Sequence, residues 1–145
     1  MKNKLSIASI LIALCYLSGC SQSIPKPVPI QSEDMCGYCR MSITEKQFAA
    51  ELITPDEKVF KFDDAGCLMN FIETRDSKTA ALYVTDFNSR AWIPAERAYY
   101  VSTAKVQTPM GGGFLAFQNA NDASDAVLKY NGRLLIFGEL PTKRN

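Results

Sequence analysis

The sequence predicts an α+β fold made of two similar ββαβ units that pack together. Three observations lead to this prediction: the order strand, strand, helix, strand occurs twice, the strands are short and rich in apolar residues, and polar capping residues precede the helices. Neither repeat is long enough to bury a large core by itself, so the two units are expected to share one. Mixed or antiparallel sheets with helices on one face are expected.

Residues 35–86 are expected to form the first unit. Val59-Phe60-Lys61-Phe62 alternates with period two, as a half-buried strand does. Asp63 and Asp64 precede an apolar run at helical spacing, so both are interpreted as helix caps. The expected elements are a strand at 48–53, a turn at 54–57, a strand at 59–62, a helix carrying Cys67, Leu68, Phe71 and Ile72, and a strand at 81–84.

Residues 87–145 are expected to form the second unit, which repeats the order of the first. Asp122 is interpreted as a cap of the second helix, and Asn131-Gly132 has the chemistry of a helix C-terminus. The expected elements are strands at 98–101 and 113–117, a helix at 121–130 with Ala123, Ala126, Val127 and Tyr130 on its apolar face, and a last strand at 133–137.

Residues 1–19 are typical of a lipoprotein signal peptide. A short basic start precedes an apolar run over 5–17, and Leu17-Ser18-Gly19-Cys20 has the form of a lipobox. Processing of such a signal leaves lipid on Cys20, so we expect a membrane-anchored chain that does not span the bilayer. Ser21 favours the outer membrane over the inner, with the protein facing the periplasm, or the outer cell surface otherwise. The alternative is an ordinary cleaved signal or an N-terminal anchor helix.

Residues 20–34 are expected to be the lipidated N-terminus and a tether. Pro25, Pro27 and Pro29 occupy alternate positions, which favours an extended polyproline-like spacer. At roughly 3 Å per residue, such a spacer would hold the folded part away from the lipid.

The charge balance argues against a nucleic-acid partner. The chain has 16 Lys and Arg, 15 Asp and Glu and no His, which gives a formal net charge of +1 at pH 7. The sequence contains neither a basic stripe nor an evident platform for base stacking. Without histidine, a nucleophile and its base cannot be assembled by the usual routes, so we predict no enzyme activity.

The cysteine count predicts an unpaired thiol. Of five cysteines, Cys15 lies in the signal and Cys20 carries lipid, which leaves Cys36, Cys39 and Cys67. Small exported domains normally have an even number, so at least one thiol is expected to be free or metal-bound. The alternative is a disulfide of Cys36 with Cys39 or Cys67. Cys67 is interpreted first as a buried structural cysteine, and otherwise as a ligand or disulfide partner.

Soft sulfur donors are concentrated in Cys36-Gly37-Tyr38-Cys39-Arg40-Met41, at the start of the expected globular part. Thiolate and thioether ligands select Cu(I) over hard cations. Cys39 and Met41 are two residues apart and would point to the same side of an extended segment, where both reach one ion. A copper(I) site is therefore the first hypothesis.

Other chemistries fit the same motif less well. Cys36 and Cys39 have the spacing of a periplasmic thiol–disulfide oxidoreductase, which is the alternative function, although that motif normally lies between a strand and a helix. Arg40 stands where attachment of c-type haem requires histidine. A zinc site would need an oxygen ligand, such as Asp34, in addition to the cysteines.

Several motifs after the tether occur in a fixed order. They are Asp34-x-Cys36-x-x-Cys39-x-Met41-x-Ile43, Phe48-Ala49-Ala50, Phe62-Asp63-Asp64-x-Gly66-Cys67, Tyr83-Val84-x-Asp86, Trp92-Ile93, Ala98-x-Tyr100-Val101, Thr108-Pro109-Met110-Gly111 and Ala116-Phe117. This pattern resembles the NosL family, the accessory lipoproteins of nitrous oxide reductase. The resemblance implies two ββαβ units related to the fold of organomercurial lyase. It also implies a chaperone that binds Cu(I) and, with a membrane copper and sulfur transporter complex, supplies nitrous oxide reductase during denitrification.

The resemblance also implies a set of metal ligands. It places the family's Cys-x-Met pair on Cys39 and Met41, and a further methionine ligand on Met110, for which core packing beside a turn is the alternative. Some members are thought to add a histidine nitrogen, and this chain has no histidine. The third donor therefore stays open, with Cys36 and Asp34 as neighbouring candidates and water or a partner group as others.

Overall fold

A computed structural model of the chain describes residues 24–75 and 78–141. The expected signal peptide at 1–19 and the lipidation site Cys20 lie outside the described residues. In the described part, helices are all too short or too polar to cross a membrane.

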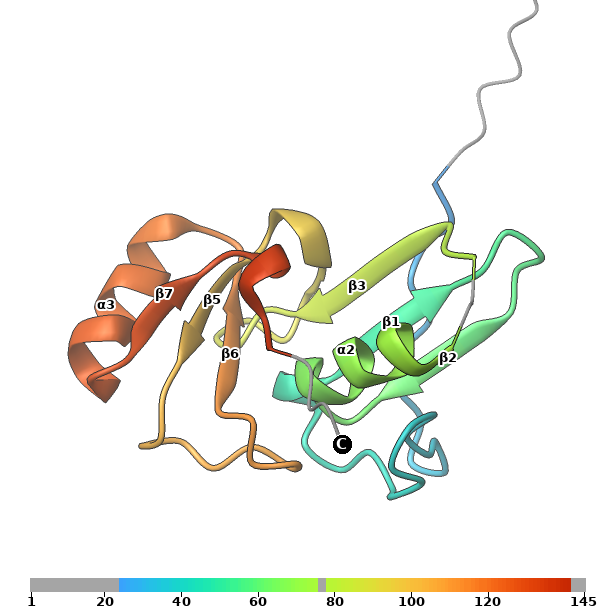
Figure 1. The fold of residues 1–145 in the computed structure, drawn as a ribbon, viewed down its shortest axis with the longest axis horizontal. Coiled ribbons are helices and arrows are strands. Elements are labelled where there is room, and N and C mark those ends of the chain that lie inside the picture. The colour runs from blue at the N-terminus through green and yellow to red at the C-terminus, as the bar shows by residue number, and fades with distance from the viewer. Residues whose placement is uncertain (1–23, 76–77, 142–145) are drawn as a thin grey trace, which may run out of the picture.

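The fold consists of two antiparallel sheets that lie side by side (Figure 1). The strands are β1 (Ala50–Ile53), β2 (Val59–Phe62), β3 (Ala81–Thr85), β4 (Trp92–Pro94), β5 (Tyr99–Ser102), β6 (Phe114–Phe117) and β7 (Arg133–Leu135). The first sheet has the order β2-β1-β3-β4, and the second has the order β6-β5-β7. The predicted α+β class is confirmed, and of the two arrangements expected for the sheets, the antiparallel one is found.

The repeated ββαβ order is also present. The first unit contains α2 (Ala65–Thr74) between β2 and β3, and the second contains α3 (Ala120–Tyr130) between β6 and β7. In both units the first strand is central and pairs with the second and third strands. Leu52 of β1, for example, lies opposite Phe60 and Leu82 on its two neighbours.

Strand β4 was not expected. It pairs with β3 through Thr85 and Trp92, so it belongs to the first sheet although it follows the boundary expected at residue 86. The connecting turn is tight, with the Asp86 N–H donating to the carbonyl of Ala91 at 2.8 Å and Arg90 at a φ of 62°. A strand of three residues is too short to show an alternating pattern, which is why the sequence did not reveal it.

The helix ends follow local sequence signals, with two corrections, the first of which is that Asp63, also expected as a cap, is not the N-cap of α2. Asp64 is the N-cap of α2, and its carboxylate accepts from the Cys67 N–H at 2.8 Å. The N-cap of α3 is Asn119, whereas Asp122, expected as the cap, lies in the first turn and donates its N–H to the Asn119 side chain. Asn131 ends α3 in the left-handed conformation, as predicted.

Two expected strands are shorter than the sequence suggested. Residues Lys46–Phe48 form a 3-10 helix before β1, and β7 ends at Leu135 before another 3-10 helix at Phe137–Glu139; a further one lies at Ala95–Arg97, between β4 and β5. Leu52 and Ile53 of β1 and Leu135 of β7 are almost fully buried, whereas Leu134 and Ile136 of the expected last strand are exposed.

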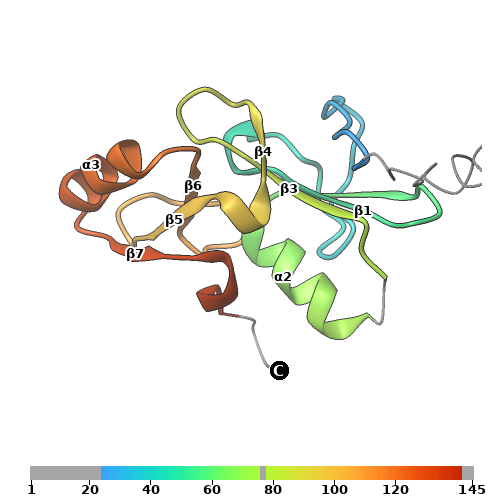
Figure 2. The same ribbon diagram turned by 90° about the horizontal axis from the view of Figure 1, so that it is seen from above.

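The largest buried cluster is shared by the two units, as expected from their small size. Leu52, Phe62 and Phe71 of the first unit belong to the same buried cluster as Tyr100 and Leu135 of the second. Helix α2 covers one face of the first sheet, and residues 24–35 lie on the other face (Figure 2). The end of β2 and the start of α2 are thereby held next to the hairpin that follows this N-terminal segment.

The N-terminal segment 24–34, expected to be part of a free tether, is fastened to the first sheet. The Glu51 carboxylate accepts from the Val28 N–H at 3.0 Å, and the Tyr83 hydroxyl donates to the carbonyl of Pro25 at 2.7 Å. The described part of the expected tether therefore lies against the domain. Two lysines donate to further carbonyls of the segment, Lys46 to Ile30 at 2.8 Å and Lys61 to Pro29 at 2.9 Å.

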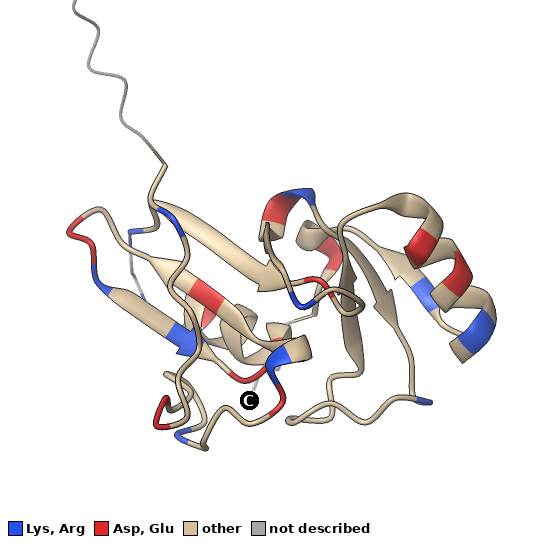
Figure 3. Cartoon of the chain, turned by 180° about the vertical axis from the view of Figure 1, so that it is seen from behind, with Lys and Arg blue, Asp and Glu red and all other residues tan. Residues whose placement is uncertain are grey.

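Charged side chains of both signs are interspersed over the two units (Figure 3). The pair of Lys58 and Asp56 is exposed at the turn between β1 and β2. The pair of Lys61 and Asp34 is more buried and links β2 to the N-terminal segment. Asp34 also accepts from the backbone of Gln31, so the carboxylate considered as a metal donor is already engaged.

Candidate metal centre

The Cys-x-x-Cys-x-Met motif forms a tight hairpin. Met35 and Ser42 pair as an isolated bridge, and the Cys36 N–H donates to the carbonyl of Met41 at 2.8 Å. Arg40 has a φ of 67°, which turns the chain back. The segment is therefore not extended, and the alternation argument that placed the Cys39 and Met41 side chains on one side does not hold here.

The hairpin brings two of its cysteines to a third cysteine and an aspartate. The sulfurs of Cys36, Cys39 and Cys67 and a carboxylate oxygen of Asp63 all lie within 4.8 Å of one another. We call these four residues the thiol cluster. Cys36, Asp63 and Cys67 are at most 2% exposed, whereas Cys39 is partly exposed. All three cysteines are free thiols, so the disulfides considered from the sequence are not formed in this structure.

Three elements position the thiol cluster. Asp63 directly follows β2, and Cys67 is the third residue of α2, where its N–H is held by the Asp64 cap. The hairpin is attached to β2 by the Gly37 N–H, which donates to the carbonyl of Lys61 at 2.7 Å. The spacing of the donors is thus fixed by backbone contacts and not by the side chains alone.

Asp63 is the least expected member of the thiol cluster. Its Oδ2 accepts from the Cys39 thiol at 3.2 Å, and its Oδ1 is buried without a hydrogen-bond partner among the described residues. A buried carboxylate oxygen without a partner is costly. The arrangement is therefore suited to a positively charged ligand.

The electrostatics of the thiol cluster favour one thiolate in particular. The pKa of Cys36 is lowered to about 6, because the Cys67 thiol and the backbone N–H groups of Asp63, Cys39 and Tyr38 stabilise its anion. Burial raises the pKa of Cys39 to about 12, with a contribution from the neighbouring Asp63 carboxylate. The pKa of Cys67 is also raised, first by Cys36 and then by burial. A first negative charge is thus favoured on Cys36, and further thiolates require a cation.

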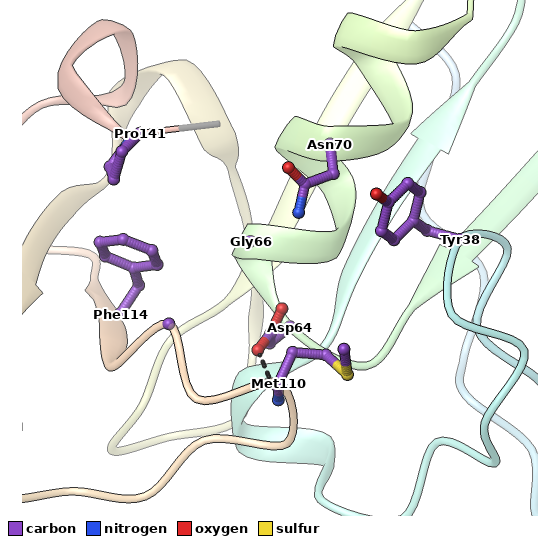
Figure 4. Close-up of a pocket in the computed structure, with 8 residues that line it drawn as sticks. Tyr38, Asp64, Gly66, Asn70, Met110, Phe114 and Pro141 are labelled. Carbon is purple, nitrogen blue, oxygen red and sulfur yellow. Dashed lines mark hydrogen bonds between the residues drawn. The ribbon is translucent and has the colours of Figure 1, made fainter. Parts of the chain in front are cut away.

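The two predicted methionine ligands occupy different surroundings. Met41 is 56% exposed on the hairpin. The Met110 N–H donates to the Asp64 carboxylate at 3.0 Å, and its side chain lines a cavity of about 180 Å³ with its sulfur on the side nearer Tyr38 (Figure 4). The other residues that line this cavity are Asp64, Gly66, Asn70, Gly112, Phe114 and Pro141.

The structure groups the predicted ligands differently from the sequence. It brings Cys36 and Cys39 together with Asp63, which was expected only as a helix cap, and with Cys67, for which a ligand role was the alternative to that of a buried structural cysteine. The sequence did contain a signal for both: an odd number of cysteines, and two adjacent aspartates just before the third cysteine when one is enough to cap a helix. The ligand roles of Met41 and Met110 stay predictions.

Comparison with known proteins places the chain in a family. The sequence profile of the NosL family matches residues 27–144. The crystal structure of the copper chaperone NosL from Shewanella denitrificans is similar with a TM-score of 0.71 and 27% sequence identity, over 81% of this chain and 96% of that chain. A search of curated proteins gave no match. The family profile covers most of the chain, including the hairpin and the thiol cluster, and the chain therefore belongs to the NosL family.

Proposed function

We propose that this protein is a copper-binding chaperone that takes up Cu(I) at the thiol cluster and passes it to another protein. The observation that carries the proposal is the convergence of three free thiols within 4.8 Å of one another, two from the hairpin and one from the first turn of α2, of which only Cys39 is partly exposed. Soft thiolate donors select Cu(I) over hard cations. Membership of the NosL family and similarity to a solved copper chaperone support the same function.

The exposure of the sulfurs suits a metal that must be released. Cys36 and Cys67 are buried and would hold the ion from the inside, while the partly exposed Cys39 lies at the rim. Met41 is exposed beside it and could complete the coordination or receive the ion first. Met110, in the adjoining cavity, is a further candidate ligand. Release would then proceed by ligand exchange at the open side.

The recipient and the location are part of the proposal. The resemblance in sequence supports nitrous oxide reductase as the recipient, with a membrane copper and sulfur transporter complex as helper. The signal at 1–19 supports lipid attachment at Cys20, which would hold the chaperone at a membrane outside the cytoplasm. Residues 24–34 lie against the first sheet and so do not contribute to a free tether.

Thiol–disulfide oxidoreductase activity of Cys36 and Cys39 is not favoured by the geometry. The thiol with the lowered pKa, Cys36, is fully buried and lies in a hairpin instead of at a helix N-terminus. A reactive thiolate in such enzymes must be accessible to the substrate disulfide. We therefore propose a carrier without enzyme activity.

Competition for Cu(I) with a chromogenic chelator tests the proposal. Cys39→Ser is expected to lower the affinity for Cu(I) more than about 100-fold, because loss of an outer-shell partner alone costs 10–100-fold. If this variant competes as well as the parent, or if X-ray absorption of the loaded protein shows only nitrogen and oxygen neighbours, the assignment fails.

Substitution of Met41 tests its role as a ligand, and Met35, on the same hairpin, provides the matched control. Met35 and Met41 are exposed to 57% and 56%, and only Met41 belongs to the predicted ligand set. Met41→Leu is expected to weaken retention of Cu(I), whereas Met35→Leu leaves it unchanged. Equal effects of the two substitutions would remove Met41 from the site.

A further inference from the structure

One row of side chains fixes the N-terminal segment to the first sheet. Lys61 of β2, Glu51 of β1 and Tyr83 of β3 are direct cross-strand partners, so they lie side by side on one face of the sheet. In the same order, their polar atoms bind one backbone group each of Pro29, Val28 and Pro25. The N-terminal segment therefore crosses the sheet from β3 to β2 and is bound at each strand on the way.

Glu51 shows that this attachment belongs to the fold. Its side chain is 0% exposed in the central strand, and burial of a carboxylate is costly unless it accepts hydrogen bonds. Both of its oxygens accept from the Val28 N–H, at 3.0 and 3.2 Å. The Ile30 side chain is 7% exposed, and Lys46 donates to its carbonyl. The N-terminal segment is thus a bound part of the domain.

The side of the segment that faces away from the sheet carries two apolar side chains around a basic one. Ile24 and Val28 are exposed to 70% and 39%, and Lys26 between them is also exposed. Pro25 and Pro27, at the intervening positions, are partly buried. We call Ile24, Lys26 and Val28 the outer face. Such a combination suits a lipid surface, where apolar groups enter the headgroup region and an ammonium group contacts anionic headgroups.

The length of chain before the outer face limits its distance from the lipid. This step rests on lipid attachment at Cys20, which is part of the proposed function. The four residue steps from Cys20 to Ile24 span at most about 14 Å, whatever path the chain takes. A tether that was free as far as Asp34 would span up to roughly 50 Å. Fastening of the segment therefore keeps the outer face close to the membrane.

We propose that the outer face lies on the phospholipid surface that holds the anchor, and that this contact orients the domain. Lipid attachment would raise the effective concentration of the outer face at the membrane, so a small contact is sufficient. The surface that it fits is a headgroup layer containing anionic lipids, because Lys26 is the charged residue of the outer face.

This contact would turn the thiol cluster away from the membrane. The N-terminal segment starts at Tyr83 of β3, whereas the Gly37 N–H attaches the hairpin to β2. In Figure 1 the first described residues, in blue at the upper right, lie on the opposite side of the first unit from the hairpin. A protein that exchanges copper with Cys39 would then approach from the side remote from the lipid.

Paramagnetic broadening tests the inference on the mature chain, lipidated at Cys20 and placed in nanodiscs of phosphatidylethanolamine and phosphatidylglycerol. With a nitroxide on the lipid headgroups, the methyl signals of Ile24 and Val28 are expected to lose most of their intensity. Met41 on the hairpin and Leu128 on α3 are more exposed than Val28 and are expected to keep theirs. Equal broadening of all four would overturn the inference. So would no broadening at Ile24 and Val28, as expected if the outer face binds a protein instead.

Substitution within the outer face tests the contact itself. Ile24→Glu is expected to restore most of the intensity of the Val28 methyl signal, because a carboxylate is repelled by anionic headgroups. Leu128→Glu is the matched control, since Leu128 is 83% exposed but lies on α3 of the second unit. Both positions are exposed, so circular dichroism should show both variants folded. Unchanged broadening of Val28 in Ile24→Glu would contradict the proposed contact.

The outcomes separate this inference from the proposed function. Intact mass shows whether Cys20 carries lipid, and a chain without lipid would overturn the anchor and this inference together. An anchored chain whose outer face is not broadened would overturn this inference alone. The competition for Cu(I) involves neither lipid nor the outer face, so its result concerns only the thiol cluster.

Discussion

Asp63 and Asp64 are adjacent and chemically identical, but the fold uses them differently. Asp64 has extended backbone angles, φ −152° and ψ 169°, as N-cap residues do. In extended backbone, successive side chains point to opposite sides. When Asp64 turns toward the N–H of Cys67, Asp63 is therefore directed to the other side, among the thiols. A doublet that the sequence presents as two caps becomes one cap and one candidate ligand.

Asp86 provides a prediction at the scale of one residue. Its buried carboxylate accepts from the backbone of Ser89 at 2.7 Å and of Gln118 at 2.8 Å, and so ties β3 to the chain after β6. Asp86→Asn is expected to lower the free energy of unfolding by about 1.5–3 kcal/mol, since charge-assisted bonds are lost. Urea unfolding measures this. Asp56→Asn, at an exposed turn, is the control and should change stability little.

The effect of Asp86→Asn should depend on pH. Burial raises the pKa of Asp86, but hydrogen bonds from Ser89, Gln118 and Asn88 outweigh it, so the pKa lies below its ordinary value. The unfolded chain then takes up the proton first as pH falls. The stabilisation is complete above the ordinary aspartate pKa of about 3.9 and is lost as pH falls through the lower folded value. A difference from the parent that stays constant down to about pH 2 would contradict this account.

At the scale of elements, hydrogen bonds between backbone groups determine where the motifs go. The hairpin around Cys39 closes through bonds between Cys36 and both Arg40 and Met41, which no periodicity in the sequence reports. The helix caps, by contrast, act within a few residues of chain, and the sequence located α2 and α3 to within one or two residues. Local interactions were predictable, and closure between segments was not.

The loop that carries Met110 provides a prediction about an element. Gly113 has a φ of 67°, and a Cβ there would lie 2.1 Å from the Thr103 carbonyl oxygen. Gly113→Ala is therefore expected to cost more than the about 1–2 kcal/mol of the left-handed conformation alone. Gly111, with a φ of 70° and open space around it, is the matched control, for which we expect that conformational cost only. Equal midpoints of urea unfolding for both variants would contradict the steric argument.

At the scale of the molecule, the two units are held together by more than the shared core. The Phe87 N–H donates to the carbonyl of Ala116 at 2.8 Å, and Asp86 binds Gln118 across the same boundary. Phe48, from the first unit, packs with Val101 and Phe117 of the second. The thiol cluster lies in the first unit, whereas Met110 comes from the second and lines a cavity with Tyr38 and Asp64 of the first, so the relative position of the units sets how near the methionine comes to the cluster.

The fastened N-terminal segment provides a prediction for the whole chain. Tyr83→Phe removes the bond to Pro25 and is expected to cost about 0.5–1.5 kcal/mol, with faster hydrogen exchange of the Val28 amide that Glu51 holds. Tyr99→Phe, at a more exposed position on β5, is the control. If exchange at Val28 is unaltered by Tyr83→Phe, the segment is held by other contacts.

The sequence by itself determined the α+β class, the repeated ββαβ order, the main helices and the family. Apolar periodicity, helix caps and motif order depend on residues that are close together in the chain, so they can be recognised in the sequence alone. It also singled out Cys36 and Cys39. Only the tertiary structure decided that Asp63 and Cys67 join them, that the hairpin is not extended and that β4 completes the first sheet. These features depend on contacts between residues distant in sequence, which form only when β2, α2 and the hairpin pack against one core.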